Sequence, residues 1–125
     1  MKDKKKKYTL LIHCQLHQIR EGFEEYLNFL PFPTSVHYAD LKEEGIQSKL
    51  RFNPHIIIIL LNEADSDFLL PFKVKLFASE IPLLIISPGF PKSYKCYLEE
   101  IGVDKIIELP IGKDIVCQAI EKMIY

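Results

Sequence analysis

Cys14 and Arg20 are the residues of this chain whose types and spacing point most directly to a reaction. They belong to a His-Cys-(five residues)-Arg pattern that begins at His13. A thiolate can attack a phosphate ester, and a guanidinium can hold two of its oxygens. The pattern follows an apolar, strand-like segment, so it would lie on a loop whose backbone N–H groups can bind an anion. Cys14 and Arg20 are therefore candidate catalytic residues.

This pattern matches the signature of cysteine-dependent phosphatases, but the composition of the loop argues against that activity. A phosphate-binding loop needs glycine or other small residues that turn successive N–H groups inward, and residues 15–19 include none. Glu21 follows Arg20, which places a negative charge beside the proposed anion. We therefore expect a protein that is not an enzyme. A small phosphatase or phosphotransfer protein that uses Cys14 and Arg20 is the alternative.

The sequence offers little support for a metal-binding or nucleotide-binding site. His13, Cys14 and His17 offer three ligands for Zn²⁺ or Cu⁺, without the fourth ligand of a structural zinc site. The chain has no glycine-rich phosphate-binding motif. We predict neither a bound metal ion nor a cofactor.

The elements that must position these residues alternate between strand-like and helix-like segments. Five apolar segments predict strands at Tyr8–His13, Ser35–Ala39, His55–Leu61, Pro82–Ser87 and Lys105–Leu109. Helical spacing predicts helices at residues 19–30, Leu41–Phe52, Asp67–Ala78 with Asp67 as N-cap, 94–101 closed by Gly102, and 116–123. Such alternation predicts a doubly wound parallel sheet with helices on both faces. Right-handed crossovers favour the strand order 2-1-3-4-5.

Length and composition fit one α/β domain in a reducing compartment. The chain has 125 residues, 48% hydrophobic and 26% charged, as in ordinary globular proteins. The longest apolar run, Ile56–Leu61, is too short to cross a bilayer. Three widely spaced cysteines and no secretory signal favour the cytoplasm. Residues 1–7 include five Lys and one Asp, and we expect a disordered basic leader before a domain at 8–125.

The end of the third predicted strand carries a recognisable spacing. Asn62 stands two residues after Leu60, and Asp67 stands seven residues after it. With the β-α alternation, this spacing resembles the receiver domains of bacterial two-component response regulators, over essentially residues 8–124. The resemblance implies a CheY-like, flavodoxin-like three-layer sandwich. It also places Leu60 where receivers carry the phospho-accepting aspartate.

Other positions of the receiver pocket also lack the charged side chains that the family carries there. The resemblance places His13 and Cys14 at the acidic pair that holds Mg²⁺, and Leu109 at the lysine that contacts the phosphate. Ser87 retains the hydroxyl of the fourth strand, and Pro110 retains a proline whose preceding bond is usually cis in receivers. Ile106 stands at the family's aromatic switch position.

These changes predict a degenerate, non-phosphorylatable receiver. Leucine has no nucleophilic oxygen, and a His–Cys pair is a poor site for a hard cation, so we expect no Mg²⁺. Leu60 and Leu109 would fill the pocket with apolar packing instead. A receiver phosphorylated elsewhere, for example on Asp65, is a further alternative.

The resemblance also implies where partners bind. Receivers use the fourth helix, fifth strand and fifth helix for dimers and partners. We expect a signalling module in a two-component-type phosphorelay that contacts a protein partner or a second copy, and neither nucleic acid nor membrane. The candidate contact residues on this face are Tyr94, Tyr97, Ile106, Glu108, Lys113 and Gln118.

Overall fold

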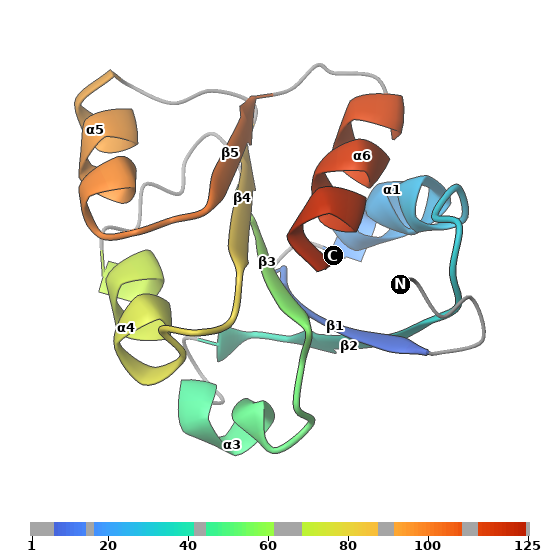
Figure 1. Ribbon diagram of the computed structural model, residues 1–125, viewed down its shortest axis with the longest axis horizontal. Helices are drawn as coiled ribbons and strands as arrows, with labels where there is room; N and C mark the ends of the chain where they lie inside the picture. The colour runs from blue at the N-terminus through green and yellow to red at the C-terminus, as the bar shows by residue number, and fades with distance from the viewer. Residues whose placement is uncertain are drawn as a thin grey trace.

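A five-stranded parallel sheet forms the middle of the molecule (Figure 1). The computed structural model describes residues 7–14, 17–41, 45–61, 69–87, 92–108 and 113–124; the side chains of residues 17–20 and 113 lie outside this description. The strands are β1 (Tyr8–His13), β2 (Thr34–Ala39), β3 (Ile56–Leu60), β4 (Leu83–Ser87) and β5 (Lys105–Glu108). Their order is β2-β1-β3-β4-β5, which confirms the predicted topology.

Helices cover both faces of this sheet. The described helices are α1 (His17–Leu27), α3 (Ile46–Leu50), α4 (Leu69–Phe77), α5 (Lys92–Glu100) and α6 (Lys113–Ile124). Helices α1 and α6 lie on one face, and α3, α4 and α5 lie on the other (Figure 1). None of these helices is both long enough and apolar enough to cross a membrane. The arrangement is the predicted three-layer α/β sandwich.

Strand β3 is buried on both faces. Each of its residues is 5% exposed or less. Ile56, Ile58 and Leu60 pack in the layer under α1 and α6, whereas Ile57 and Ile59 pack in the layer under α3, α4 and α5. A run of isoleucines suits this position, because β-branched side chains pack well on a pleated surface and both faces of a central parallel strand are covered.

The end of α5 follows the prediction from Gly102. This glycine has a φ of 92°, a left-handed conformation that glycine adopts without a steric penalty. Its N–H donates to the carbonyl of Glu99 at 3.2 Å, and the N–H of Val103 donates to the carbonyl of Leu98 at 3.1 Å. These two bonds form a Schellman motif, which satisfies carbonyls that the helix end would otherwise leave open.

Two helices differ from their predicted bounds. The predicted helix Leu41–Phe52 is interrupted at Gly45, whose φ is 83°, and α3 spans Ile46–Leu50. Leu41 is also helical, and residues 42–44 lie outside the described residues. Helix α1 ends at Leu27, and the N–H groups of Phe29 and Leu30 donate to carbonyls three residues earlier in a tighter final turn. The predicted N-cap Asp67 lies outside the described residues.

Asp104 joins three elements at the amino edge of the sheet. Its Oδ2 accepts hydrogen bonds from the Leu83 N–H at 2.8 Å and from Lys75 Nζ at 3.3 Å. Its own N–H donates to the Leu83 carbonyl at 3.1 Å. Lys75 Nζ also donates to the carbonyls of Ser79 and Ile81. Asp104 and Lys75 thus connect α4 to the starts of β4 and β5, at the amino edge of the sheet.

Replacing Asp104 tests this connection. Asp104→Ala leaves the Leu83 N–H without its acceptor, so we expect the free energy of unfolding to fall by about 1–2 kcal/mol. Asp104→Asn keeps an acceptor oxygen and loses the charge, so its loss should be smaller. Urea unfolding measures both, with Glu80→Ala, at an exposed position, as control. An Asp104→Ala protein as stable as the control would contradict this role.

Candidate functional site at the carboxyl edge of the sheet

Strand pairing brings the candidate pocket residues to one edge of the sheet. In the pairing of β1 with β3, His13 lies opposite Ile59, so the next residues along are Cys14 and Leu60. Leu60 in turn pairs with Ile86 of β4, the residue before Ser87. Because parallel strands end at a common edge, this register gathers Cys14, Leu60 and Ser87 where ligands of such sheets usually bind.

The Leu60 side chain belongs to the core of the protein. It is 5% exposed and packs in the apolar cluster that includes Cys14, Ile58 and Ile86 and that α1 and α6 cover. The ladder continues one residue further, because the Leu61 N–H donates to the Ile86 carbonyl at 2.9 Å. An aliphatic side chain in this setting contributes packing and offers no atom that could accept a phosphoryl group.

His13 connects β1 to the segment after β2. Its side chain is fully buried, and its Nδ1 accepts a hydrogen bond from the Leu41 N–H at 2.9 Å. The same nitrogen lies 3.9 Å from Asp40 Oδ1. A nitrogen that accepts an N–H uses its lone pair to do so, so Nδ1 is not available to a metal ion in this arrangement. His13 therefore holds the backbone of a neighbouring strand end.

Cys14 is unsuited to attack a substrate from solvent in this structure. It is 3% exposed, lies in the same apolar cluster as Leu60, and has its backbone N–H directed to the Ala39 carbonyl at 3.4 Å. A reactive thiolate normally needs access and a cationic surrounding. The side chains of Arg20 and His17, its proposed partners in phosphate and metal binding, lie outside the described residues.

Ser87, at the end of β4, is 3% exposed. Asn62, Asp65, Leu109 and Pro110 lie outside the described residues. Within the part of the chain that is described, no three His, Cys, Asp or Glu side chains gather as a metal site would require.

The remaining cysteines differ in environment. Cys96 is exposed, whereas Cys117 of α6 is buried and its Sγ donates to the Tyr26 carbonyl of α1 at 2.9 Å. Burial raises the pKa of the Cys117 thiol, and the charges of Asp114 and Glu121 raise this pKa further. The neutral thiol is therefore the form that the α1–α6 contact stabilises.

Comparison with solved structures identifies the architecture. A putative response regulator from Chloroflexus aurantiacus is 20% identical, with 95% of this chain and 98% of that chain covered and a TM-score of 0.78. A response regulator receiver protein from Pseudoalteromonas atlantica is 13% identical over 93% and 96%, also at 0.78. An atypical orphan response regulator, described as having a phosphorylation-independent regulatory mechanism, is 18% identical over 93% and 94%, at 0.68.

The chain has the receiver fold. No protein-family model matches the sequence, and no curated protein matches it. The identities to the solved structures are low, so the likeness concerns the architecture, and it extends over nearly the whole of each receiver compared.

The predicted contact residues of this receiver fold differ in how accessible they are. Tyr94 is 2% exposed and packs in the cluster under α3, α4 and α5, on the inward side of the apolar stripe of α5, so in this structure its side chain contributes to the core. Tyr97 and Ile106 are half-buried against the same cluster. Glu108 forms an ion pair with Lys95 of α5. Gln118 is exposed, and the Lys113 side chain lies outside the described residues.

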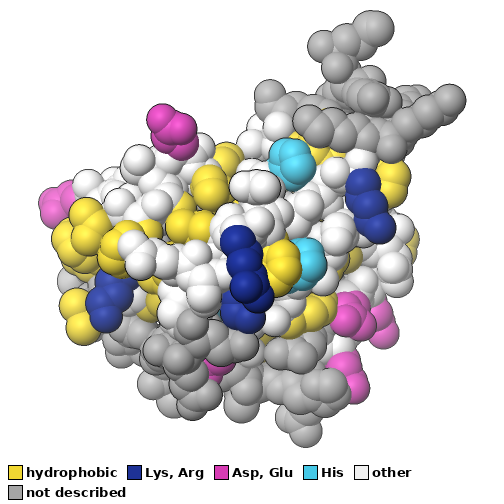
Figure 2. All heavy atoms as spheres, turned by 90° about the horizontal axis from the view of Figure 1, so that it is seen from below, with side chains coloured by type: hydrophobic (Ala, Val, Ile, Leu, Met, Phe, Trp, Pro, Cys, Tyr) yellow, Lys and Arg dark blue, Asp and Glu magenta, His cyan; other side chains and the backbone are white. Residues whose placement is uncertain are grey.

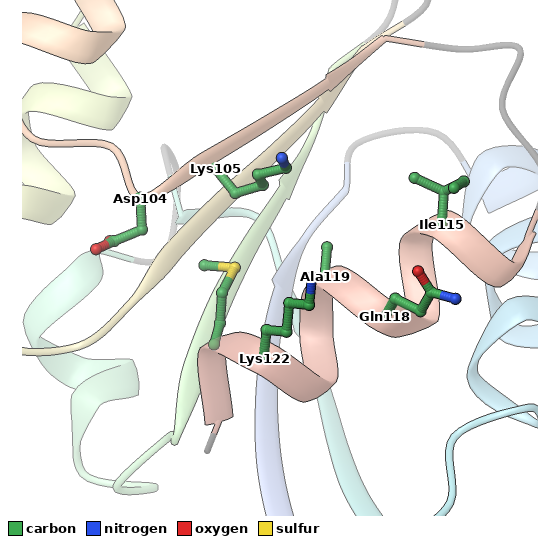
Figure 3. Close-up of a pocket in the computed structure, with 7 residues that line it drawn as sticks. Asp104, Lys105, Ile115, Gln118, Ala119 and Lys122 are labelled. Atoms are coloured by element: carbon green, nitrogen blue, oxygen red, sulfur yellow. The ribbon is translucent and has the colours of Figure 1, made fainter.

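A groove beside β5 is lined by Gln118, one of the predicted contact residues, and by residues that the sequence did not single out as contacts. It has a volume of about 300 Å³ and lies between the start of β5 and α6 (Figure 3). Ile115, on its α6 side, is 48% exposed. The lining residues are Asp104, Lys105, Ile115, Gln118, Ala119, Lys122 and Met123. Only the placement of α6 against the free edge of β5 reveals this hollow, because the residues come from two separate segments.

Truncating Leu60 tests its place in the core. Leu60→Ala removes buried aliphatic atoms and leaves a cavity, so we expect a loss of about 2–4 kcal/mol in the free energy of unfolding. Leu69→Ala, a matched change at a side chain that is 63% exposed, should change stability little. Chemical denaturation compares the two. Equal stabilities would show that Leu60 is not buried in solution.

Thiol reactivity tests the three cysteine environments. With Ellman's reagent we expect Cys96 to react at once and Cys14 and Cys117 to react only as the protein unfolds, because the reagent cannot reach buried sulfurs. The pKa of the Cys117 thiol is higher in the folded state, so the buried neutral thiol contributes fully to stability at pH values below its ordinary pKa of 9.0. That contribution is lost as the pH rises through the pKa of the folded state. Cys96→Ser should remove the fast phase.

A fast reaction at Cys14 would contradict its burial. If such a protein also hydrolysed para-nitrophenyl phosphate, and Cys14→Ser abolished the turnover, the phosphatase alternative would replace the receiver interpretation.

Proposed function

We propose that this chain is a non-phosphorylatable receiver-like module of two-component-type signalling, which acts in the cytoplasm through protein contacts. The observation that carries the proposal is Leu60: the β1–β3–β4 register puts this residue at the carboxyl end of the central strand, and its side chain is 5% exposed in an apolar cluster. Phosphorylation of a receiver needs a carboxylate oxygen at that place.

The neighbours of Leu60 support the same conclusion. His13 uses Nδ1 to accept the Leu41 N–H, and Cys14 is buried beside Leu60. Mg²⁺ prefers hard oxygen ligands in near-octahedral geometry, and neither side chain supplies one. A receiver without the acceptor and without the cation ligands has no means of taking a phosphoryl group from a donor.

Tight packing at this edge also favours one constant conformation. A phosphorylation switch requires two arrangements of comparable free energy. Here Ile106, which the receiver resemblance places at the aromatic switch position, is half-buried in the cluster of α3, α4 and α5. A solved receiver of the same fold is described as an atypical orphan with a phosphorylation-independent mechanism, which offers a precedent for signalling in this way.

The contact surface of the module is the face formed by α5, β5 and α6. Its accessible groups are the Lys95–Glu108 pair, Gln118, Ile115 and the rim of the groove beside β5. An apolar side chain surrounded by charged and amide groups is the composition of an ordinary protein interface. We assign this face to a protein partner or to a second copy of the chain.

Treatment with acetyl phosphate and Mg²⁺ tests the proposal. We expect no acid-labile phosphoprotein in the mass spectrum, and an amide NMR spectrum that does not change. A phosphorylatable receiver treated in parallel provides the positive control. An adduct on any aspartate, including Asp65, would refute the proposal, and peptide mapping would identify the acceptor.

A further inference from the structure

Helix α4 carries apolar side chains on the side that faces solvent. Among the described residues, the exposed large hydrophobics of this helix are Leu69 (63%), Phe72 (46%), Leu76 (63%) and Phe77 (47%). Figure 2 shows apolar side chains gathered on the left of the molecule, the side on which α4 lies in Figure 1. The helix is nine residues long, so four of its nine positions expose large apolar groups.

These exposed residues form one stripe opposite the buried face of the helix. At 100° per residue, Leu69, Phe72, Leu76 and Phe77 fall within an arc of about 140°. Leu70, Pro71 and Val74 occupy the opposite side and are buried, so the core already holds the helix in place. Aromatic side chains cover on the order of 150–250 Å² each, and the two phenylalanines and two leucines of the stripe are 46–63% exposed. Their exposed portions therefore add up to a few hundred Å², a size that often marks a binding site.

Positive charge accompanies the stripe. Lys73 is exposed and lies within the same arc, between Leu69 and Phe77. Helix α3 packs beside α4 and ends in a second basic group, where Lys49 and Arg51 place their cations 5.9 and 5.4 Å from the Phe52 ring. Lysine and arginine side chains lie among the apolar groups of this surface in Figure 2. A complementary occupant would combine apolar and acidic side chains.

A second copy of the chain fits this surface poorly. Lys73 is the middle residue of α4, so a two-fold pairing of α4 with its copy would bring the two ammonium groups together at the axis, and like charges there oppose association. Helix α1 exposes Glu21, Glu24 and Glu25, but its large apolar residues Phe23 and Leu27 are buried. In the described part of the chain, no helix combines an exposed apolar stripe with flanking carboxylates.

We infer that the solvent face of α4 binds an amphipathic helix of another protein, in which acidic residues flank an apolar stripe. Leu69, Phe72, Leu76 and Phe77 take the apolar side chains, and Lys73 takes a carboxylate. The two surfaces together would bury on the order of 800 Å², less than stable complexes bury, so the contact is transient. This inference does not depend on the proposed function, because it uses none of the residues of the α5–β5–α6 face.

A pair of synthetic peptides tests the inference. The probe is a helix-forming peptide of about 18 residues with leucine at every third or fourth position and glutamate on both flanks; the control peptide carries lysine in place of each glutamate. Fluorescence anisotropy should show the glutamate peptide binding at least about tenfold more tightly than the lysine peptide. With the unaltered protein, amide NMR shifts should concentrate on α4 and neighbouring α3.

Variants of exposed residues then separate the apolar from the charged contribution to peptide binding. Leu76→Ser should weaken the glutamate peptide about tenfold, because it removes an apolar contact, and Lys73→Glu should reverse the preference between the two peptides. Phe29→Ser, a change at an apolar side chain that is 54% exposed beyond the end of α1, should leave binding unchanged. All three side chains are at least partly solvent-exposed, so circular dichroism should show intact folding.

Three results would overturn the inference. Equal binding of both peptides would show apolar adhesion without the predicted charge selectivity. Light scattering that reveals a dimer, disrupted by Leu76→Ser, would make a second copy the occupant. Sedimentation with vesicles containing phosphatidylserine, lost in Leu76→Ser, would make a membrane surface the occupant. The acetyl phosphate experiment decides the proposed function separately.

Discussion

The burial of β3 on both faces is the constraint on which the rest of this structure depends. A central parallel strand without access to water admits apolar side chains at almost no cost, and it admits a polar side chain only when a partner satisfies it. Ile56–Leu60 meets this condition with aliphatic residues alone. Strands β1 and β4 pair with β3 on either side. Leu60, the last residue of β3, therefore lies in the middle of the carboxyl edge, where its side chain determines which chemistry is available.

The two edges of the sheet have different roles. At the amino edge, Asp104, Lys75 and the backbone of Leu83 connect a helix and two strands by hydrogen bonds and an ion pair. At the carboxyl edge, Leu60 and Cys14 pack among aliphatic groups, and His13 accepts the N–H of Leu41. The ion pair that connects α4 to the sheet thus lies at the opposite edge from Leu60, and hydrogen bonds between elements occur at both edges.

Local sequence signals predicted the fold well. Apolar, β-prone segments predicted each strand to within one or two residues, and Gly102 marked the end of α5 because its φ of 92° suits glycine. Gly45 was the same kind of signal and was overlooked, so the predicted helix Leu41–Phe52 ran across a position where the helix is interrupted. The site was harder to predict. His13 and Leu41 are 28 residues apart, and no local pattern announces their bond. In α4, apolar residues surround the helix, so its sequence does not tell which half the sheet covers.

At position 60, the packing that stabilises the fold is incompatible with a charged, reactive side chain. A carboxylate there would lie in the apolar layer between the sheet and α6, among side chains that include Ile58 and Ile86, and burying an unpaired charge is costly. Replacing Leu60 with aspartate would therefore lower the stability of the fold. Under the function proposed above, the same change would not by itself create a phosphorylation site, because His13 and Cys14 offer no oxygen ligand for a cation. Folding stability thus opposes any single change that introduces charge at this position.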